Sequence, residues 1–244
     1  MDINCDLGEG AGTDEQLLDA VTSANIACGF HAGTAQTMDA TVAMATARRV
    51  VIGAHVSYPD RSGFGRRHLD VSDEELITDV LFQIGALDAL CRRHDTTVRY
   101  VKAHGALYND LADDPQLAAA YGRAILDYGG ELAVLVLAGT PAVELLAGLG
   151  LGVVREAFAD RAYTAGGRLV SRRQAGAVLT DPDQVAERAL RLAAGRPVQA
   201  VDGSQLALDA ESLCVHGDTP GAVALAVAIR RRLEAEGRQP AAFA

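Results

Sequence analysis

The sequence predicts an α/β protein folded as a (β/α) barrel, and three observations support this prediction. Short apolar runs of strand length alternate with longer helical segments along the whole chain. The runs are almost continuously apolar, which is typical of parallel strands that helices cover on both faces. The length of 244 residues suits one such barrel, and no repeat, low-complexity tract or linker divides the chain. We therefore expect one domain over residues 1–244.

The strands are expected in eight apolar segments. These lie at 3–7, 24–28, 50–54, 98–102, 132–138, 152–156, 197–201 and 212–216. Seven or eight such strands in a chain of 244 residues favour a closed barrel over an open sheet.

Helix-start signals stand between these segments. Capping-box patterns occur at Thr13–Gln16 and at Ser72–Glu75, and the second precedes a periodic apolar run that reaches Leu90. Three more starts pair an N-cap side chain with proline at the first helical position: Asp114-Pro115, Asp181-Pro182 and Thr219-Pro220. They predict helices over 115–128, 182–194 and 220–236, and further helices are expected over 34–49 and 141–146.

Composition excludes several classes of function. The net charge of −10 would repel a nucleic acid, and no basic stripe offsets it. No uncharged apolar run is long enough to span a membrane, and no secretory signal is visible at the first residues, so a cytoplasmic location is expected. The four cysteines form no C-x-x-C pair, which predicts reduced thiols. Those that end strands are expected to be buried core residues rather than nucleophiles.

Histidines gather where the predicted strands end. Four of the six, His31, His55, His104 and His216, follow strands, at the rim where (β/α) barrels carry their chemistry. One such histidine is commonly a core residue, but four together favour a shared site. His68 and His94 lie in polar, helix-flanking sequence and are expected on the surface.

Carboxylates follow the same strands, at Asp6, Glu156, Asp160 and Asp218. A cluster of histidines and acids can bind a divalent metal or supply a general base, and the sequence leaves both open.

Lys102 is the only lysine among 22 basic residues, and it ends a predicted strand. It either pairs with a structural acid or acts on substrate as an anion-binding group, with neighbouring cations moving its pKa towards neutrality.

Two glycine-rich stretches, at 8–12 and 62–67, could offer backbone N–H groups to an anion. Neither has dinucleotide-binding spacing, and no Walker sequence occurs, so this chain is not expected to bind ATP. The loop over 55–67 carries Tyr58 and Arg66 and either covers an anionic substrate or is simply solvated.

Eight blocks of sequence carry a resemblance to a known family. They are NCDLGEG (4–10), SANIACGFHAG (23–33), IGAHVSYPDRSGFGRR (52–67), QIGAL (83–87), VKAHGALYN (101–109), FADRAY (158–163), LVSRRQAGAVL (169–179) and CVHGD (214–218). Together they resemble the LamB/YcsF family from end to end. The resemblance implies a seven-stranded (β/α) barrel of the glycoside hydrolase and deacetylase type.

The resemblance also implies an activity, that of the A subunit of the prokaryotic ATP-dependent 5-oxoprolinase, which opens 5-oxoproline to glutamate. Subunits B and C would phosphorylate the lactam with ATP, and this chain would complete the hydrolysis.

Within that activity, the hypothesis assigns catalysis to Asp6, His31, His55, Lys102 and His104. It assigns substrate binding to Asn4, Tyr58, Arg66, Asp160, Arg161, His216 and Asp218, with Arg161 as the carboxylate clamp. A divalent metal on Asp6, His31 and His55 is left open.

Two other functions stay open. A metal-dependent deacetylase or glycan hydrolase would use the same residues, although the absence of tryptophan and an aromatic content of 5% favour a small substrate over a sugar chain. A non-catalytic regulatory subunit would have little use for four strand-end histidines. Association of the chain with copies of itself is also left open.

Overall fold

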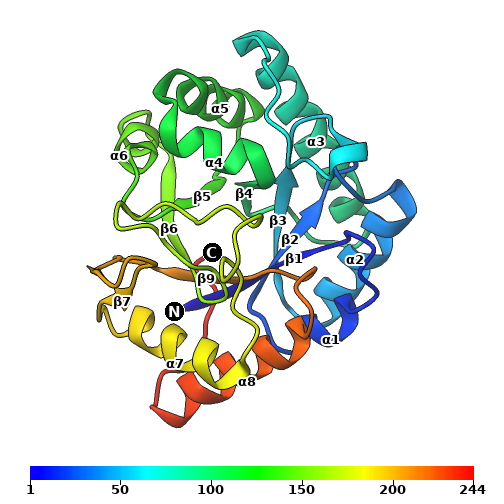
Figure 1. Cartoon of the computed structure of the whole chain (residues 1–244). Coiled ribbons are helices and arrows are strands. Elements are labelled where there is room, and N and C mark those ends of the chain that lie inside the picture. Colours follow the sequence, from blue (N-terminus) through cyan, green and yellow to red (C-terminus); the bar gives the residue numbers. More distant parts are fainter.

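The computed structural model describes residues 1–244 and confirms the seven-stranded barrel. All seven strands are parallel and close in the order β1-β2-β3-β4-β5-β6-β9 (Figure 1). They are β1 (Asp2–Leu7), β2 (Ser23–Ala27), β3 (Val51–Val56), β4 (Tyr100–Ala103), β5 (Ala133–Leu137), β6 (Gly152–Phe158) and β9 (Ser212–Val215).

The segment at 197–201, predicted as a strand, is not part of the barrel. Only β7 (Val198–Gln199) forms there, and it pairs antiparallel with β8 (Gln205–Leu206) in a separate hairpin. A turn that includes Gly203, at φ +88°, reverses the chain and closes this hairpin, while β6 and β9 pair directly with each other.

Helices surround the barrel at the expected places. They are α1 (Asp14–Leu18), α2 (Ala35–Ala47), α3 (Asp73–Arg93), α5 (Pro115–Tyr128), α6 (Pro141–Gly148), α7 (Pro182–Ala193) and α8 (Ala222–Ala235). Ser72 and Glu75 form the predicted capping box, and Asp114 and Asp181 cap their helices. Thr13 accepts no capping hydrogen bond.

The predicted cap at Thr219 is wrong. The helix begins two residues after Pro220, with Gly221 at φ +80° as its N-cap residue. The Thr219 hydroxyl instead donates to Asp160 at 3.3 Å, which ties the start of α8 to the end of β6.

One helix was not predicted: α4 (Gly105–Asp113) begins immediately after β4. Gly105 has φ +58°, and a Cβ there would lie 2.3 Å from the carbonyl oxygen of Gly65. That same oxygen accepts from Ala106 N at 2.8 Å. Glycine is therefore required where the loop after β3 touches the loop after β4.

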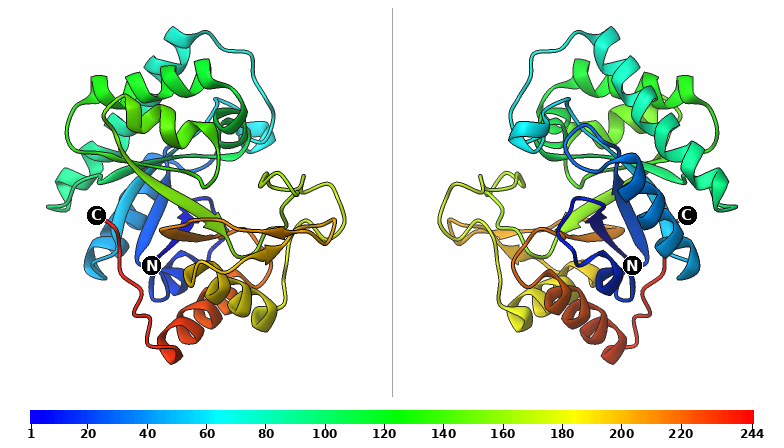
Figure 2. Two further views of the ribbon diagram at one scale, coloured as in Figure 1. Left: turned by 90° about the vertical axis from the view of Figure 1, so that its left-hand side faces the viewer. Right: turned by 90° about the vertical axis from the view of Figure 1, so that its right-hand side faces the viewer.

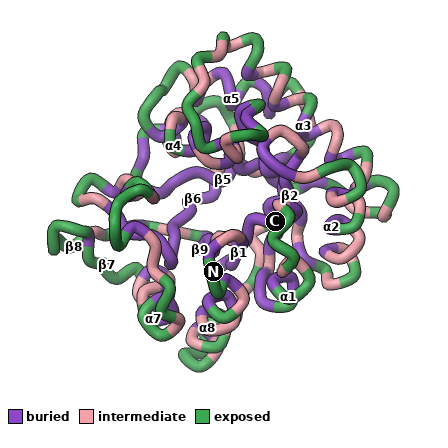
Figure 3. Tube along the Cα trace, turned by 45° about the vertical axis from the view of Figure 1, so that its right-hand side comes forward, coloured by how far each residue is buried: buried purple, intermediate pink, exposed green.

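The barrel strands are mostly buried, whereas the outer faces of the helices and much of the β7–β8 hairpin are exposed (Figure 3). At the amino-terminal end of the barrel, Phe243 from the C-terminal tail packs on Tyr100 with ring centroids 5.1 Å apart. The segment between β6 and α7, yellow-green in Figure 2, extends from the barrel on the same side as the β7–β8 hairpin. None of the helices is long and apolar enough to cross a membrane.

Candidate active site

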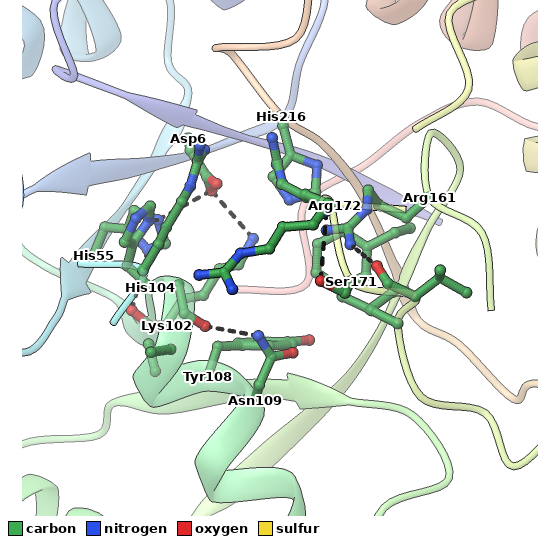
Figure 4. Close-up of a pocket in the computed structure, with 18 residues that line it drawn as sticks. Asp6, His55, Lys102, His104, Tyr108, Asn109, Arg161, Ser171, Arg172 and His216 are labelled. Atoms are coloured by element: carbon green, nitrogen blue, oxygen red, sulfur yellow. Dashed lines mark hydrogen bonds and ion pairs between the residues drawn. The ribbon is translucent and has the colours of Figure 1, made fainter. Parts of the chain in front are cut away.

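A cavity of about 530 Å³ opens at the carboxyl ends of the strands (Figure 4). Its wall combines strand ends with α4 and with the segment between β6 and α7. Seven of the predicted site residues line it: Asp6, His55, Arg66, Lys102, His104, Arg161 and His216. His31 lies just behind, with its ring stacked on His104 at 3.8 Å between centroids.

Lys102 enters the barrel interior from β4, where its side chain is 2% exposed. Its Nζ lies 2.9 Å from Glu156 Oε1 and 3.2 Å from Asp6 Oδ1, and it also contacts the Asn4 amide oxygen and Cys214 Sγ. These partners come from β1, β6 and β9, so one ammonium joins four strands of the barrel. Lys102 therefore pairs with structural acids, which is one of the two roles that the sequence left open for it.

The expected shift of Lys102 towards neutrality is wrong. Burial opposes the charged form, but the Asp6 and Glu156 carboxylates raise the pKa of Lys102 well above its usual value. The neighbours are anions rather than the cations that the hypothesis required.

Asp6 is held in its ionised form. Burial alone would raise its pKa, but His55 and Lys102 lower the pKa of Asp6 well below its ordinary range. Asn25 Nδ2 also donates to Asp6 Oδ1 at 2.8 Å. The cavity therefore contains a carboxylate in a fixed orientation.

The backbone partners of His55 and His104 determine which ring nitrogen of each donates a hydrogen bond. His55 Nδ1 donates to the Lys102 carbonyl oxygen at 3.2 Å, and His104 Nε2 donates to the Phe64 carbonyl oxygen at 2.9 Å. In the neutral rings the lone pairs are therefore on His55 Nε2 and His104 Nδ1, which face each other at 3.0 Å. Burial and the neighbouring histidines lower the pKa of His104 well below its ordinary value, which favours the neutral ring.

A further carboxylate, Glu9, completes this cluster. Glu9 Oε1 lies 3.0 Å from His31 Nε2 and 3.4 Å from His104 Nδ1. Burial and Asp6 raise the pKa of Glu9 well above its usual value. The donor atoms of Glu9, His31, His55 and His104 all lie within 4.8 Å of one another, so these four residues could hold a metal ion.

The cavity mouth is rich in arginine. Arg172 extends from the segment between β6 and α7 across the cavity (Figure 4). Arg172 and Arg66 each form an ion pair with Asp218. Arg161 is placed differently: its guanidinium donates to the carbonyl oxygens of Ala177 and Val170. Burial and Arg172 lower the pKa of Arg161 to about 10.

His216 is oriented by Asp160. The buried Asp160 carboxylate lies 3.0 Å from His216 Nδ1, so this nitrogen carries a proton and Nε2 remains free. Burial opposes the charged form of Asp160, but His216 lowers the pKa of the carboxyl below its usual value.

The sequence profile described as the LamB/YcsF family matches residues 1–244. The chain belongs to this family.

Relatives cover nearly the whole chain. One of the 5-oxoprolinase A subunits of Agrobacterium fabrum is 53% identical, covering 100% of this chain and 98% of the relative. One of the 5-oxoprolinase A subunits of Pseudomonas syringae is 52% identical, covering 96% and 93% respectively.

Solved structures agree on the fold. The lactam utilization protein from Thermus thermophilus superimposes with a TM-score of 0.93 at 42% identity, covering 100% of this chain and 99% of that one. A family 4 carbohydrate esterase from Streptomyces lividans gives a TM-score of 0.54 at 12% identity, covering 100% and 92%. At that identity the likeness concerns the barrel alone.

Within this family barrel, not every predicted site residue reaches the cavity. Asn4 lies deeper in the barrel, donating to Glu156 and Ser212. Tyr58 turns away, and its hydroxyl donates to Asp110 at 2.9 Å. Asp160 and Asp218 act through His216 and the two arginines rather than from the cavity wall.

Several functional side chains were missed by the sequence analysis. Glu9 lies in a stretch interpreted only as glycine-rich, although it is part of the block NCDLGEG. The cavity wall also includes Tyr108, Asn109, Ser171, Arg172 and Arg173. All five fall within the blocks VKAHGALYN and LVSRRQAGAVL, so the family blocks contained the only signal that could have found them.

Proposed function

We propose that this chain is the hydrolytic subunit of an ATP-dependent 5-oxoprolinase, which opens phosphorylated 5-oxo-L-proline to L-glutamate. Partner subunits B and C would use the ATP. Two relatives named as A subunits of 5-oxoprolinase, each more than 50% identical over nearly the whole chain, support the assignment.

The charge of the cavity is the observation that carries this proposal. Five basic side chains and one carboxylate line it, in a chain whose net charge is −10: Arg66, Lys102, Arg161, Arg172, Arg173 and Asp6. Glu156 and Asp218 pair with three of these cations from behind the wall, and the basic side chains still outnumber the acidic ones, which favours a small anion. The substrate carries a carboxylate, and phosphorylation of the lactam oxygen adds a second anionic group.

Arg172 is the best-placed cation for that anion, because its side chain reaches across the cavity (Figure 4), whereas Arg173 is exposed. Lys102 and Arg161 already donate to protein oxygens, whereas Arg172 has only Asp218 as an ion-pair partner, at 3.4 Å. A substrate anion can share or replace that weak contact. We therefore assign the clamp to Arg172 with Arg66, and we assign to Arg161 the role of fastening the segment that carries Arg172.

Asp6 is proposed as the general base. It is the one carboxylate among the residues that line the cavity, and Lys102 and Asn25 keep it ionised and fixed in orientation. Its lowered pKa makes it a weaker base than a free carboxylate, so its contribution depends on its position beside the water. The water oxygen then bonds to the ring carbon that carries the phosphorylated oxygen. Both water protons pass to the ring nitrogen, one of them through Asp6, as the carbon–nitrogen bond breaks and the ring opens to an acyl phosphate. A second water releases inorganic phosphate from that acyl phosphate and leaves glutamate.

The test is an assay of glutamate release from 5-oxoproline and ATP with both partner subunits present. Asp6→Asn should lower kcat by about 100-fold or more. Arg231→Gln, on the exposed face of α8, is the matched control and should leave turnover unchanged. Normal turnover without this chain would contradict the proposal. A chain that is required but unaffected by Asp6→Asn would indicate the regulatory alternative.

A further inference from the structure

In the histidine cluster beside the cavity, two rings place the same kind of nitrogen against each other. His55 Nδ1 and His104 Nε2 both donate to backbone carbonyl oxygens, so neutral rings would bring no proton to the 3.0 Å contact between His55 Nε2 and His104 Nδ1. Asp6 Oδ1 lies 3.4 Å from the same His55 Nε2 and adds negative charge. The contact therefore requires a positive charge, either a proton or a metal ion.

We propose that Glu9, His31, His55 and His104 form a site for a divalent transition-metal ion of the zinc class. The proposal goes beyond the proposed function, because ring opening as described above uses Asp6 and the arginines and requires no metal. It also differs from the triad of Asp6, His31 and His55 that the sequence analysis left open.

The spacing of the ligand atoms suits such an ion. A tetrahedral ion with bonds of about 2.0–2.1 Å places its ligands about 3.3–3.4 Å apart. Glu9 Oε1 lies 3.0 Å from His31 Nε2, 3.4 Å from His104 Nδ1 and 3.8 Å from His55 Nε2. With the 3.0 Å contact between His55 and His104, these separations bracket the required distance.

The surroundings of the rings also match a metal site. Metal-binding histidines usually donate their second ring nitrogen to a carbonyl or carboxylate, as His55 and His104 do here. The loop after β3 fixes the rings, because a Cβ at Gly65 would lie 2.9 Å from both His104 and His31. His55 and His104 line the cavity, which gives an ion a route to the site.

The donor set determines the class of ion. Three imidazoles and one carboxylate favour zinc and its transition-metal neighbours, whereas Mg²⁺ and Ca²⁺ prefer oxygen ligands. His31 is the weakest of the four ligands, because its Nδ1 is buried without a hydrogen-bond partner. A second group, Asp6, Cys214 and His216, is less suitable because the Lys102 ammonium lies 3.1 Å from Cys214 Sγ.

The experiment measures metal binding by the isolated chain after chelator treatment. Competition titration at pH 7.5 should give one Zn²⁺ per chain with a submicromolar Kd, and Co²⁺ should give the intense visible absorption of four-coordinate sites. Mg²⁺ should not compete. Failure to bind Zn²⁺ or Co²⁺ at 10 µM would overturn the proposal and leave a shared proton as the cation between His55 and His104.

Variants locate the ion. His55→Ala and His104→Ala should each weaken Zn²⁺ binding by about 100-fold or more, because loss of an outer partner alone costs 10–100-fold. Glu9→Gln should weaken it by about tenfold. His68→Ala, whose ring is exposed and pairs with Asp110, is the matched control and should bind normally. Equal binding by wild type and both histidine variants would refute this ligand set.

Circular dichroism shows whether each variant is folded, and the wild-type titration tests the site without any variant. The measurement also separates the two proposals. A chain that binds no metal can still open the lactam, and a chain inactive towards the lactam can still bind the ion.

Discussion

Replacing Lys102 by methionine removes the only ammonium in the barrel and leaves two buried carboxylates without their cation. Glu156 is 0% exposed and Asp6 is 6% exposed, at 2.9 and 3.2 Å from Nζ. Removing one partner of a buried ion pair costs about 3–5 kcal/mol, because the remaining charge is neither solvated nor paired. For a protein of this size, that corresponds to a fall of about 6–20 °C in Tm.

Thermal and urea unfolding, followed by circular dichroism, measure this loss. The loss should be smaller at pH 5 than at pH 8, because unpaired buried carboxylates have a raised folded pKa and destabilise the fold as the pH rises. Lys102→Arg should not restore stability, since a planar guanidinium does not fit the ammonium's fully buried position.

A double variant tests the cause. Adding Glu156→Gln to Lys102→Met removes one unpaired charge at nearly constant volume, so it should recover part of the lost stability. If Lys102→Met lowers the free energy of unfolding by less than about 1 kcal/mol, Lys102 is not part of a buried ion pair of the expected strength, because breaking such a pair costs more. Turnover alone cannot identify the role of Lys102, because this variant should lose stability and activity together.

Four other changes separate the remaining roles. Arg172→Gln should raise KM for 5-oxoproline about tenfold or more and leave Tm unchanged. Arg161→Gln should instead lower Tm, because it loses two hydrogen bonds to carbonyl oxygens worth about 2–4 kcal/mol together. Equal Tm values for the two variants would contradict this division of roles. Asp160→Asn should raise KM for 5-oxoproline, because the orientation and tautomer of His216, a cavity-lining residue expected to bind substrate, are no longer fixed, and steady-state kinetics decide this. The wild type should lose stability in urea unfolding as the pH falls below about 4, because Asp6 has a lowered folded pKa and its contribution is present only above that range. The isolated chain should not bind ATP, and micromolar binding by calorimetry would exclude the proposed division of labour between subunits.

The barrel, and the rim where its polar residues gather, could both be predicted from local sequence patterns. Continuous apolar runs and proline-started helices are local features, and seven of the eight predicted strands form the barrel. Polar residues placed directly after strands, such as Asp6, His55 and His104, had to meet at one rim, because the carboxyl ends of parallel strands lie at the same end of a barrel. The prediction that residues 197–201 form a barrel strand was wrong, because the length and apolarity of a segment do not show which strand it pairs with.

The contacts between side chains depend on the three-dimensional fold. Lys102 and its partners on β1 and β9 are separated by 96–112 residues, so no local pattern could show that its neighbours are anions. Arg161 and Arg172 look alike in sequence, but only one of them finds two backbone carbonyl oxygens in its own loop. Glu9 follows β1, and it meets the histidines because the closed barrel brings the loops after its strands together. Pairing, burial and pKa depend on distances across the barrel, which the order of residues along the chain does not specify.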